Sequence, residues 1–219
     1  KAFGLQSVAA LKGYQQFYPL YQDSLKAAGL TVAGKTAEYG KDFIIQLNNN
    51  ETGKFKGSKI VFAGYGIDDE KYSDYTRLDV KGKIVIIFLG EPKKDGKYFL
   101  SGTSRSSAWT FPGIPKKLEA AAAKGATGVF VINPTQETFN ERAVATGKKT
   151  GVYFPRNTPG GKTVNCAQLS HAFAKAMIGN NFDTLLKIVK ANGTIDKQWA
   201  SESRSKVAYK FEKYRTTIN

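Results

Sequence analysis

An unbroken apolar run, mostly of β-branched residues, extends from Ile84 to Leu89. Turn residues bound it on both sides, with Gly82 before it and Gly90-Glu91-Pro92 after it. An amphipathic helix would carry polar residues every few positions, and a strand with one solvent-exposed face would alternate apolar and polar residues. The run therefore predicts a strand that is buried on both faces, at the centre of a sheet around which the rest of the chain folds.

A second continuous apolar run, Gly128 to Asn133, follows a segment with the marks of a helix. Pro115 suits a first helical turn, Leu118 belongs to an apolar stripe, and Gly125 is placed to end the helix. Two strands joined by a long connection that contains a helix form a crossover unit. We expect these two strands to lie parallel, with a right-handed connection.

Weaker periodicity predicts further elements on both sides of this unit. The segment before Gly29 is expected to be irregular at first and then a short helix that Gly29 ends. Ser170 is a favourable N-cap for another helix, and a further helix is expected from Phe182. Strands are expected at residues 42–47, 58–67, 152–154, 163–169 and 206–213, with a polar hairpin turn at residues 48–57.

The length of 219 residues is enough to bury one full core or to form two small domains. The first residues, Lys1-Ala2-Phe3-Gly4, contain neither an initiator Met nor a signal-peptide core, so we expect the segment to come from a longer protein. No apolar stretch reaches the roughly 18 residues that a bilayer span needs, so no membrane span is expected. Cys166 is a single cysteine, which excludes an internal disulfide framework.

The formal net charge is +15. Such an excess attracts polyanions such as nucleic acid, anionic lipid or acidic polysaccharide. The lysines are spread mainly over turns and strand ends and do not gather with aromatic residues on one element. Solvated loops are therefore the favoured interpretation, and nucleic acid is not the expected partner.

A long connection, residues 93–114, follows the central strand and is rich in Gly, Ser and Thr. Connections of this length inside a domain are usually functional or disordered, and the aromatic residues here argue against disorder. We therefore expect this connection to contact a substrate or a partner. The candidate contact residues are Tyr98, Arg105, Trp109, Phe111 and the glycine-flanked Tyr65. The alternative is that the aromatic residues fold back as a lid on the core.

One segment, Gly29 to Thr36, formally matches the phosphate-binding pattern G-x-x-x-x-G-K-[ST]. That pattern binds phosphate where a buried strand leads into a helix, whose N-terminal amides cradle the anion. Here the expected order is inverted, with a helix before the match and a strand after it. We do not expect a nucleotide site.

Five carboxylates lie within a dozen residues: Asp68, Asp69, Glu70, Asp74 and Asp79. Oxygen ligands of this kind could bind calcium, but the spacing lacks the glycine and the terminal glutamate of an EF-hand loop. A solvated turn with local side-chain hydrogen bonds is the favoured interpretation.

Candidate catalytic groups are few. His171 is the sole histidine and is expected in the first turn of a helix, as a surface or capping residue. A zinc site would need several converging ligands, and a Ser-His-Asp triad is not supported by Ser170 beside His171. Cys166 lies among apolar residues, where its thiol is expected to stay neutral and unreactive.

Four sequence motifs, taken together, resemble those of one known family. They are I-V-F-A-G-Y-G-I at residues 60–67, Y-S-D-Y at 72–75, D-V-K-G-K-I-V at 79–85 with G-E-P at 90–92, and K-G-A-T-G-V at 124–129 with N-P at 133–134. This set strongly resembles the protease-associated (PA) domain that is inserted in secreted zinc-dependent aminopeptidases. The resemblance extends from about residue 43 to residue 188. It also reaches both ends, since residues 3–5 resemble the close of the peptidase's leading helix and residues 214–219 resemble the strand before the catalytic domain.

The resemblance implies a β-rich α/β fold, in which a β-barrel or sandwich of about seven strands is flanked by two or more helices. It divides the chain into an N-terminal flanking segment (1–42), a PA core (43–195) and a C-terminal strand or linker (196–219). It also implies a secreted or periplasmic protein.

The resemblance further implies a role without chemistry of its own. A PA domain borders the active site of its own peptidase catalytic domain and helps to admit or select peptide or protein substrates. The family's zinc ligands, an H-x-D motif and a Glu-Glu pair among them, belong to that catalytic domain. In this chain His171 is followed by Ala172-Phe173 and no Glu-Glu pair occurs, so zinc is expected only outside this segment. The alternative is a free-standing basic module for a polyanion, either nucleic acid or a cell-wall polymer.

Overall fold

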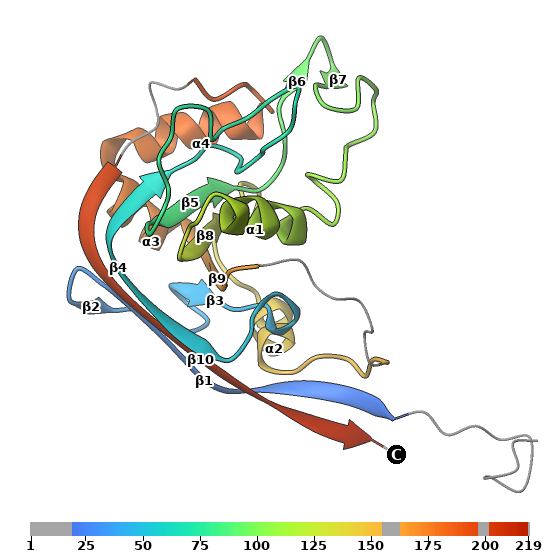
Figure 1. Cartoon of the computed structure of the whole chain (residues 1–219), viewed down its shortest axis with the longest axis vertical. Coiled ribbons are helices and arrows are strands. Elements are labelled where there is room, and N and C mark those ends of the chain that lie inside the picture. The colour runs from blue at the N-terminus through green and yellow to red at the C-terminus, as the bar shows by residue number, and fades with distance from the viewer. Residues whose placement is uncertain (1–18, 155–162, 197–201, 219) are drawn as a thin grey trace, which may run out of the picture.

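A computed structural model of the chain describes residues 19–154, 163–196 and 202–218 (Figure 1). These residues form a β-rich α/β fold with one curled sheet of eight strands, in the order β2-β1-β10-β4-β5-β8-β9-β3. The strands are β1 (Leu20–Val32), β2 (Lys35–Thr36), β3 (Phe43–Ile44), β4 (Gly53–Phe62), β5 (Ile84–Phe88), β8 (Gly128–Ile132), β9 (Cys166–Leu169) and β10 (Glu202–Ile218). The expected fold class, a β-rich α/β fold with flanking helices, is confirmed, and the curled sheet has eight strands where a barrel or sandwich of about seven was expected.

Four α-helices, two short 3-10 helices and a small hairpin complete the elements of the described residues. The helices are α1 (Ile114–Ala123), α2 (Glu141–Lys148), α3 (His171–Ile178) and α4 (Phe182–Lys190), and the hairpin is β6 (Lys93–Lys94) with β7 (Lys97–Tyr98). The long strands β1, β10 and β4 curve along one side of the molecule, and the helices lie on the inner side of that curve (Figure 1). No helix in these ranges is long and apolar enough to cross a membrane.

The central strand β5 has a core on each face. Val85 and Ile87 pack in a cluster with residues of α1, whereas Ile86 and Phe88 pack in a cluster with residues of α3 and α4. All five residues of β5 are buried because successive side chains of a strand point to opposite faces. β5 lies between β4 and β8 and is parallel to both, so the predicted central position and the predicted parallel pair are confirmed.

The N-terminal part of the sheet differs from the prediction. The helix that was expected to end at Gly29 is wrong, because these residues lie in β1. β1 pairs antiparallel with β10 from Leu20 opposite Ile218 to Val32 opposite Val207. Its partner strand lies far along the chain, so local spacing contains no sign of the pairing. We call these two strands the β1–β10 ribbon.

β1 and β2 are joined by a two-residue turn. Ala33 and Gly34 have φ values of 52° and 82°, and Val32 pairs with Lys35 across them. This geometry is a β-hairpin turn. The segment that matches the phosphate-binding pattern therefore spans a hairpin and does not lead into the helix on which that pattern depends.

Other predicted elements differ mainly at their boundaries. β4 begins at Gly53, so the polar turn predicted at residues 48–57 is wrong in its second half. The helices expected from Ser170 and Phe182 are confirmed, and the Ser170 side chain accepts a hydrogen bond from the Phe173 amide.

The helix α2 lies in a region for which the sequence pattern predicts no helix. Its N-cap is Asn140, whose Oδ1 accepts a hydrogen bond of 2.8 Å from the Ala143 amide. The strand predicted at residues 152–154 is reduced to a bridge between Tyr153 and Tyr21.

Candidate contact site

Two loops leave the same edge of the sheet. β4 and β5 are parallel neighbours, so the segments that follow them, residues 63–83 and 89–113, both start at the carboxyl ends of strands. Lys117 of α1 connects the two loops. Its Nζ donates hydrogen bonds to the carbonyl oxygens of Tyr65 (2.6 Å) and Gly90 (2.9 Å), and its side chain has no exposed surface. A buried ammonium therefore fixes the start of both loops.

Asp74 holds the first loop in a tight turn. Its Oδ2 accepts hydrogen bonds from the amides of Tyr65 (3.1 Å) and Ile67 (2.9 Å), and its Oδ1 accepts one from the Tyr72 hydroxyl (2.8 Å). Gly64 has a φ of 51°, and a Cβ built there would lie 2.3 Å from Asp74 Oδ1. Only glycine fits this close approach of the backbone to the carboxylate.

Glu91 holds the second loop, which is the long connection. Its carboxylate accepts hydrogen bonds from the Ser107 amide (2.5 Å), the Ser107 hydroxyl (2.6 Å) and the Thr110 hydroxyl (3.2 Å). Glu91 is fully buried. The long connection is therefore tied back to its own origin near the end of β5.

Burial sets the electrostatics of this cluster. Burial lowers the pKa of Lys117 to about 7, and attraction to Asp74 and Glu91 opposes this shift in part. Burial also raises the pKa of Asp74 to about 6, against hydrogen bonds from Ile67 and Tyr72. These shifts show that removal from water outweighs the attraction between the charges.

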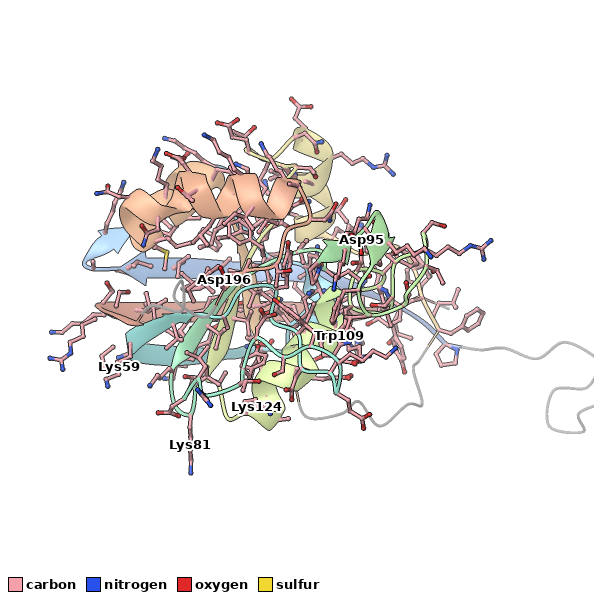
Figure 2. All side chains as sticks on the ribbon, turned by 90° about the horizontal axis from the view of Figure 1, so that it is seen from above. Lys59, Lys81, Asp95, Trp109, Lys124 and Asp196 are labelled. Carbon is pink, nitrogen blue, oxygen red and sulfur yellow. The ribbon has the colours of Figure 1, made fainter. Side chains whose placement is uncertain are left out.

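Two of the five predicted contact residues have almost no accessible surface. Tyr65 is 0% exposed and its hydroxyl donates a hydrogen bond of 2.7 Å to the Gly193 carbonyl. Trp109 is 3% exposed, and its Nε1 donates to Asp69 Oδ2 (3.1 Å). In Figure 2 Trp109 lies within the outline of the molecule, whereas Lys81 projects from it. Both aromatic side chains are buried in this site, and their contact with a partner stays a prediction.

Trp109 also explains the position of the loop. The Lys116 Nζ lies 4.4 Å from the centre of its ring, an arrangement that favours a cation–π interaction. The lid interpretation of the aromatic residues is therefore right for Trp109, which packs under the loop against α1.

The other three predicted contact residues lie nearer the surface. Tyr98 is half-buried and Arg105 is exposed. Phe111 is 83% exposed, and Phe99, which the sequence reading did not single out, is 40% exposed. Tyr98, Arg105 and Phe111 remain predicted contact residues on an anchored loop.

The acidic residues after β4 are used in local interactions. Asp68 forms an ion pair of 2.8 Å with Lys124 and accepts a hydrogen bond from Ser73, and Asp69 pairs with Trp109 as described. In residues 19–154, 163–196 and 202–218 no group of three or more His, Cys, Asp or Glu side chains could hold a metal ion.

His171 and Cys166 lie at opposite ends of β9. The His171 Nε2 is 2.8 Å from the Asn133 carbonyl, and the side chain is 7% exposed. His171 is in the first turn of α3 as predicted, but it is buried and is not a surface residue. Burial raises the pKa of the Cys166 thiol to about 12, so the prediction of a neutral thiol is confirmed.

Asn50 begins an Asn-x-Thr pattern, N-E-T, that is typical of an exposed turn, but the residue is buried. It is 2% exposed, and its Oδ1 accepts hydrogen bonds from the Cys166 amide (2.7 Å) and the Tyr209 hydroxyl (3.0 Å). It joins the start of β9 to β10, which is a structural role.

Comparison with known proteins gives weak structural matches only. No protein-family profile and no curated protein matches the chain. An aminopeptidase from Aneurinibacillus sp. strain AM-1 aligns with a TM-score of 0.46 and 14% identity, over 92% of this chain and 35% of that one. BSAP, a zinc aminopeptidase from Bacillus subtilis, aligns with a TM-score of 0.41 and 15% identity, over 90% and 34%.

A third solved structure is the subtilisin-like protease Apa1 from the Antarctic psychrotroph Pseudoalteromonas sp. AS-11. It aligns with a TM-score of 0.37 and 12% identity, over 90% of this chain and 35% of that one. The chain thus spans about a third of the length of each of these peptidases.

Proposed function

We propose that the chain is a non-catalytic PA-type domain of an exported zinc-dependent aminopeptidase. In this role it contacts its own peptidase catalytic domain and assists the access or selection of peptide substrates. Peptide hydrolysis, and the zinc that it uses, are assigned to that catalytic domain. The sequence motifs at residues 60–67, 79–85 and 124–129 support the class of domain.

The β1–β10 ribbon is the observation that carries the proposal. Leu20 and Ile218 lie opposite each other at its far end, so both described ends leave the fold side by side. A domain with adjacent ends can be inserted into another domain without disturbing it. We therefore propose that the outer divisions, residues 1–42 and 196–219, carry the core division 43–195 into the parent enzyme.

The kinetics of the parent enzyme test this proposal. We expect Arg105→Ala and Phe111→Ala to lower kcat/KM for a decapeptide several-fold, because a long substrate can reach the anchored loop. The same variants should leave hydrolysis of an aminoacyl p-nitroanilide unchanged, since that substrate contacts only the catalytic centre. Lys81→Ala serves as the matched surface control. Unchanged decapeptide kinetics in both loop variants would refute the contact role of this loop.

A second candidate function, polyanion binding, is favoured by one surface. Lys54 of β4 lies directly opposite Lys210 of β10, and Lys56 and Lys206 are also exposed on these strands. Like charges on directly opposite residues destabilise a sheet, although the Lys210 Nζ forms an ion pair of 2.9 Å with Glu212. A bound polyanion would relieve this repulsion.

Salt dependence distinguishes this second candidate. If the lysine surface binds a polyanion, the affinity for heparin should fall steeply as the salt concentration rises. The double variant Lys54→Ala/Lys56→Ala should reduce the slope of log K against log salt concentration by about two, because two cations are removed. The double variant Lys187→Ala/Lys190→Ala on α4 is the control for a general loss of charge. Equal slopes for the two double variants would reject the surface.

A further inference from the structure

A cleft of about 900 Å³ lies between the start of α1, α2 and the edge of the sheet at β3 and β9. One wall includes Pro112 and Pro115, so the cleft adjoins the end of the long connection beside the exposed Phe111. The opposite wall is formed by residues around η2 (Leu47–Asn49) and by α2. The residues that anchor the two loops of the contact site, Lys117, Asp74 and Glu91, do not line this cleft.

The polar lining of this cleft consists mainly of amide side chains. These amides are Gln46, Asn48, Asn49, Gln136, Asn140 and Gln168. An amide carries both donors and an acceptor. No Asp or Glu is among the described residues that line the cleft. The amide groups fit a part of a ligand in which donors and acceptors alternate.

Gln168 is the most informative of these residues. It is a polar residue within the buried strand β9 and is only 6% exposed. Its Nε2 donates a hydrogen bond of 3.1 Å to Gln136 Oε1. Among the described residues, Gln168 Oε1 and Gln136 Nε2 have no hydrogen-bond partner. Both residues line the cleft, so this acceptor and this donor are available to a ligand there.

A peptide group satisfies this pair. Its N–H can donate to Gln168 Oε1 while a neighbouring carbonyl accepts from Gln136 Nε2. An extended peptide repeats these groups along its length, which matches a cleft lined by several amides. Ile114 and the two prolines supply apolar surface for one side chain of the peptide.

Among the residues that the structure describes, Arg142 of α2 is the one cation that lines the cleft. In the part of the chain that the structure describes, its guanidinium forms no ion pair. A guanidinium binds a carboxylate through paired hydrogen bonds and stays charged at every physiological pH. This group therefore complements the carboxylate at the C-terminus of a peptide.

We infer that this cleft binds the C-terminal part of an extended peptide, with a peptide group on Gln136 and Gln168 and the terminal carboxylate on Arg142. This inference names a binding site for the peptide substrate. It rests on the proposed function for the identity of that substrate. It does not depend on the zinc centre or on the contacts of Arg105 and Phe111.

The test uses the 219-residue chain and two probes, acetyl-Leu-Ala-Leu with a free carboxylate and the same peptide with a C-terminal amide. In calorimetric titration we expect the acid to bind about tenfold more tightly, equivalent to one charge-assisted hydrogen bond. Arg142→Gln should remove this difference, and Gln168→Leu should weaken both peptides. Lys148→Gln also removes a cation from α2 but does not line the cleft, so it should behave as the wild type.

Three outcomes would overturn the inference. They are equal affinity of wild-type chain for acid and amide, retention of the tenfold difference in Arg142→Gln, and binding of a neutral oligosaccharide such as maltotriose without binding of either peptide. Circular dichroism of each variant separates a lost site from a lost fold. Since the titration involves no hydrolysis, its failure is distinguishable from a failure of the proposed function, which the parent enzyme's kinetics test.

Discussion

Buried charges hold two regions of this molecule together in opposite ways. In the contact site, Lys117 and Asp74 bind backbone groups, and burial moves the pKa of each toward its neutral form. In the β1–β10 ribbon, Asp23 is 2% exposed and binds cations directly. Its carboxylate accepts from Arg215 Nε at 2.9 Å and lies 3.3 Å from Lys213 Nζ.

The effect of burial on the carboxylate pKa is therefore opposed more strongly in the ribbon than in the contact site. Burial raises the pKa of Asp23, but hydrogen bonds from Arg215 and Tyr153 and the charge of Lys213 outweigh it and hold that pKa below its ordinary value. A buried carboxylate with a cation at hand stays ionised, whereas one that is satisfied mainly by neutral donors loses part of its acidity. The two regions should therefore respond differently to mutation and to pH.

The largest effect is expected for Lys117→Met. The variant leaves the buried carbonyl oxygens of Tyr65 and Gly90 without their donor. We expect a loss of about 3–5 kcal/mol in the free energy of unfolding, because both oxygens are left unsatisfied. Urea denaturation measures this loss. Lys116→Met, on the neighbouring and more accessible lysine, should cost less than about 1 kcal/mol. Equal stability of Lys117→Met and wild type would show that the buried ammonium does not hold the loops.

The pH dependence should separate the two carboxylates. The raised pKa of Asp74 means that its stabilising contribution is complete below about pH 4 and is lost as pH rises through about 6. The lowered pKa of Asp23 means the reverse: its contribution is present above about pH 4 and is lost as pH falls through its folded pKa.

Unfolding curves of wild type, Asp74→Asn and Asp23→Asn across the acid range check these signs. The stability difference between wild type and Asp74→Asn should fall with rising pH, and the difference for Asp23→Asn should grow. Two differences that change in the same direction would contradict the contrast between the regions.

At neutral pH, Asp23→Asn should destabilise the ribbon by about 2 kcal/mol, because it leaves the buried Lys213 ammonium with less compensation. Thermal unfolding is the measurement. Asp79→Asn is the matched control on an exposed carboxylate and should change stability by no more than about 0.5 kcal/mol. If the two variants were equally stable, the Asp23 cluster would have no net effect on folding.

The smallest effect is expected for Phe111→Ala in the contact site. Its ring is 83% exposed, so the folded state gains little from it, and the free energy of unfolding should change by less than about 0.5 kcal/mol. Trp109→Ala, two positions earlier in the same loop, removes a buried ring and should cost about 3–5 kcal/mol. Similar losses for the two variants would mean that Phe111 packs in the fold and is not available for contact.

The sequence was sufficient for elements with a strong local signal. β5 and β8 are continuous apolar runs, α1 begins near a proline and ends near a glycine, and Ser170 caps α3. β1 could not be predicted in the same way, because its extended form depends on β10. α2 is short and largely polar, so its apolar stripe is too weak to distinguish it from a loop.

The candidate site was chosen from the length of the connection after β5 and from its aromatic residues, and its contact role stays a prediction. The anchoring of that connection could not be predicted in detail. The burial of Tyr65 and Trp109 depends on Gly193 and Asp69, which no spacing rule links to them. Gln168 could have been noticed in the sequence, because a polar residue is unusual within the apolar strand C-A-Q-L. Its position indicates that the side chain has a polar partner.

The β1–β10 ribbon also determines how the fold meets mechanical force. Leu20 and Ile218 are opposite each other, so tension applied through the two flanks would separate the strands one pair at a time, as in opening a zipper. The ion pair between Asp23 and Arg215 lies three residue pairs along the ribbon from the Leu20–Ile218 pair. Among the described residues, this ion pair is the first that would have to break as β1 separates from β10. It would therefore resist transfer of force from the flanking segments to the rest of the sheet.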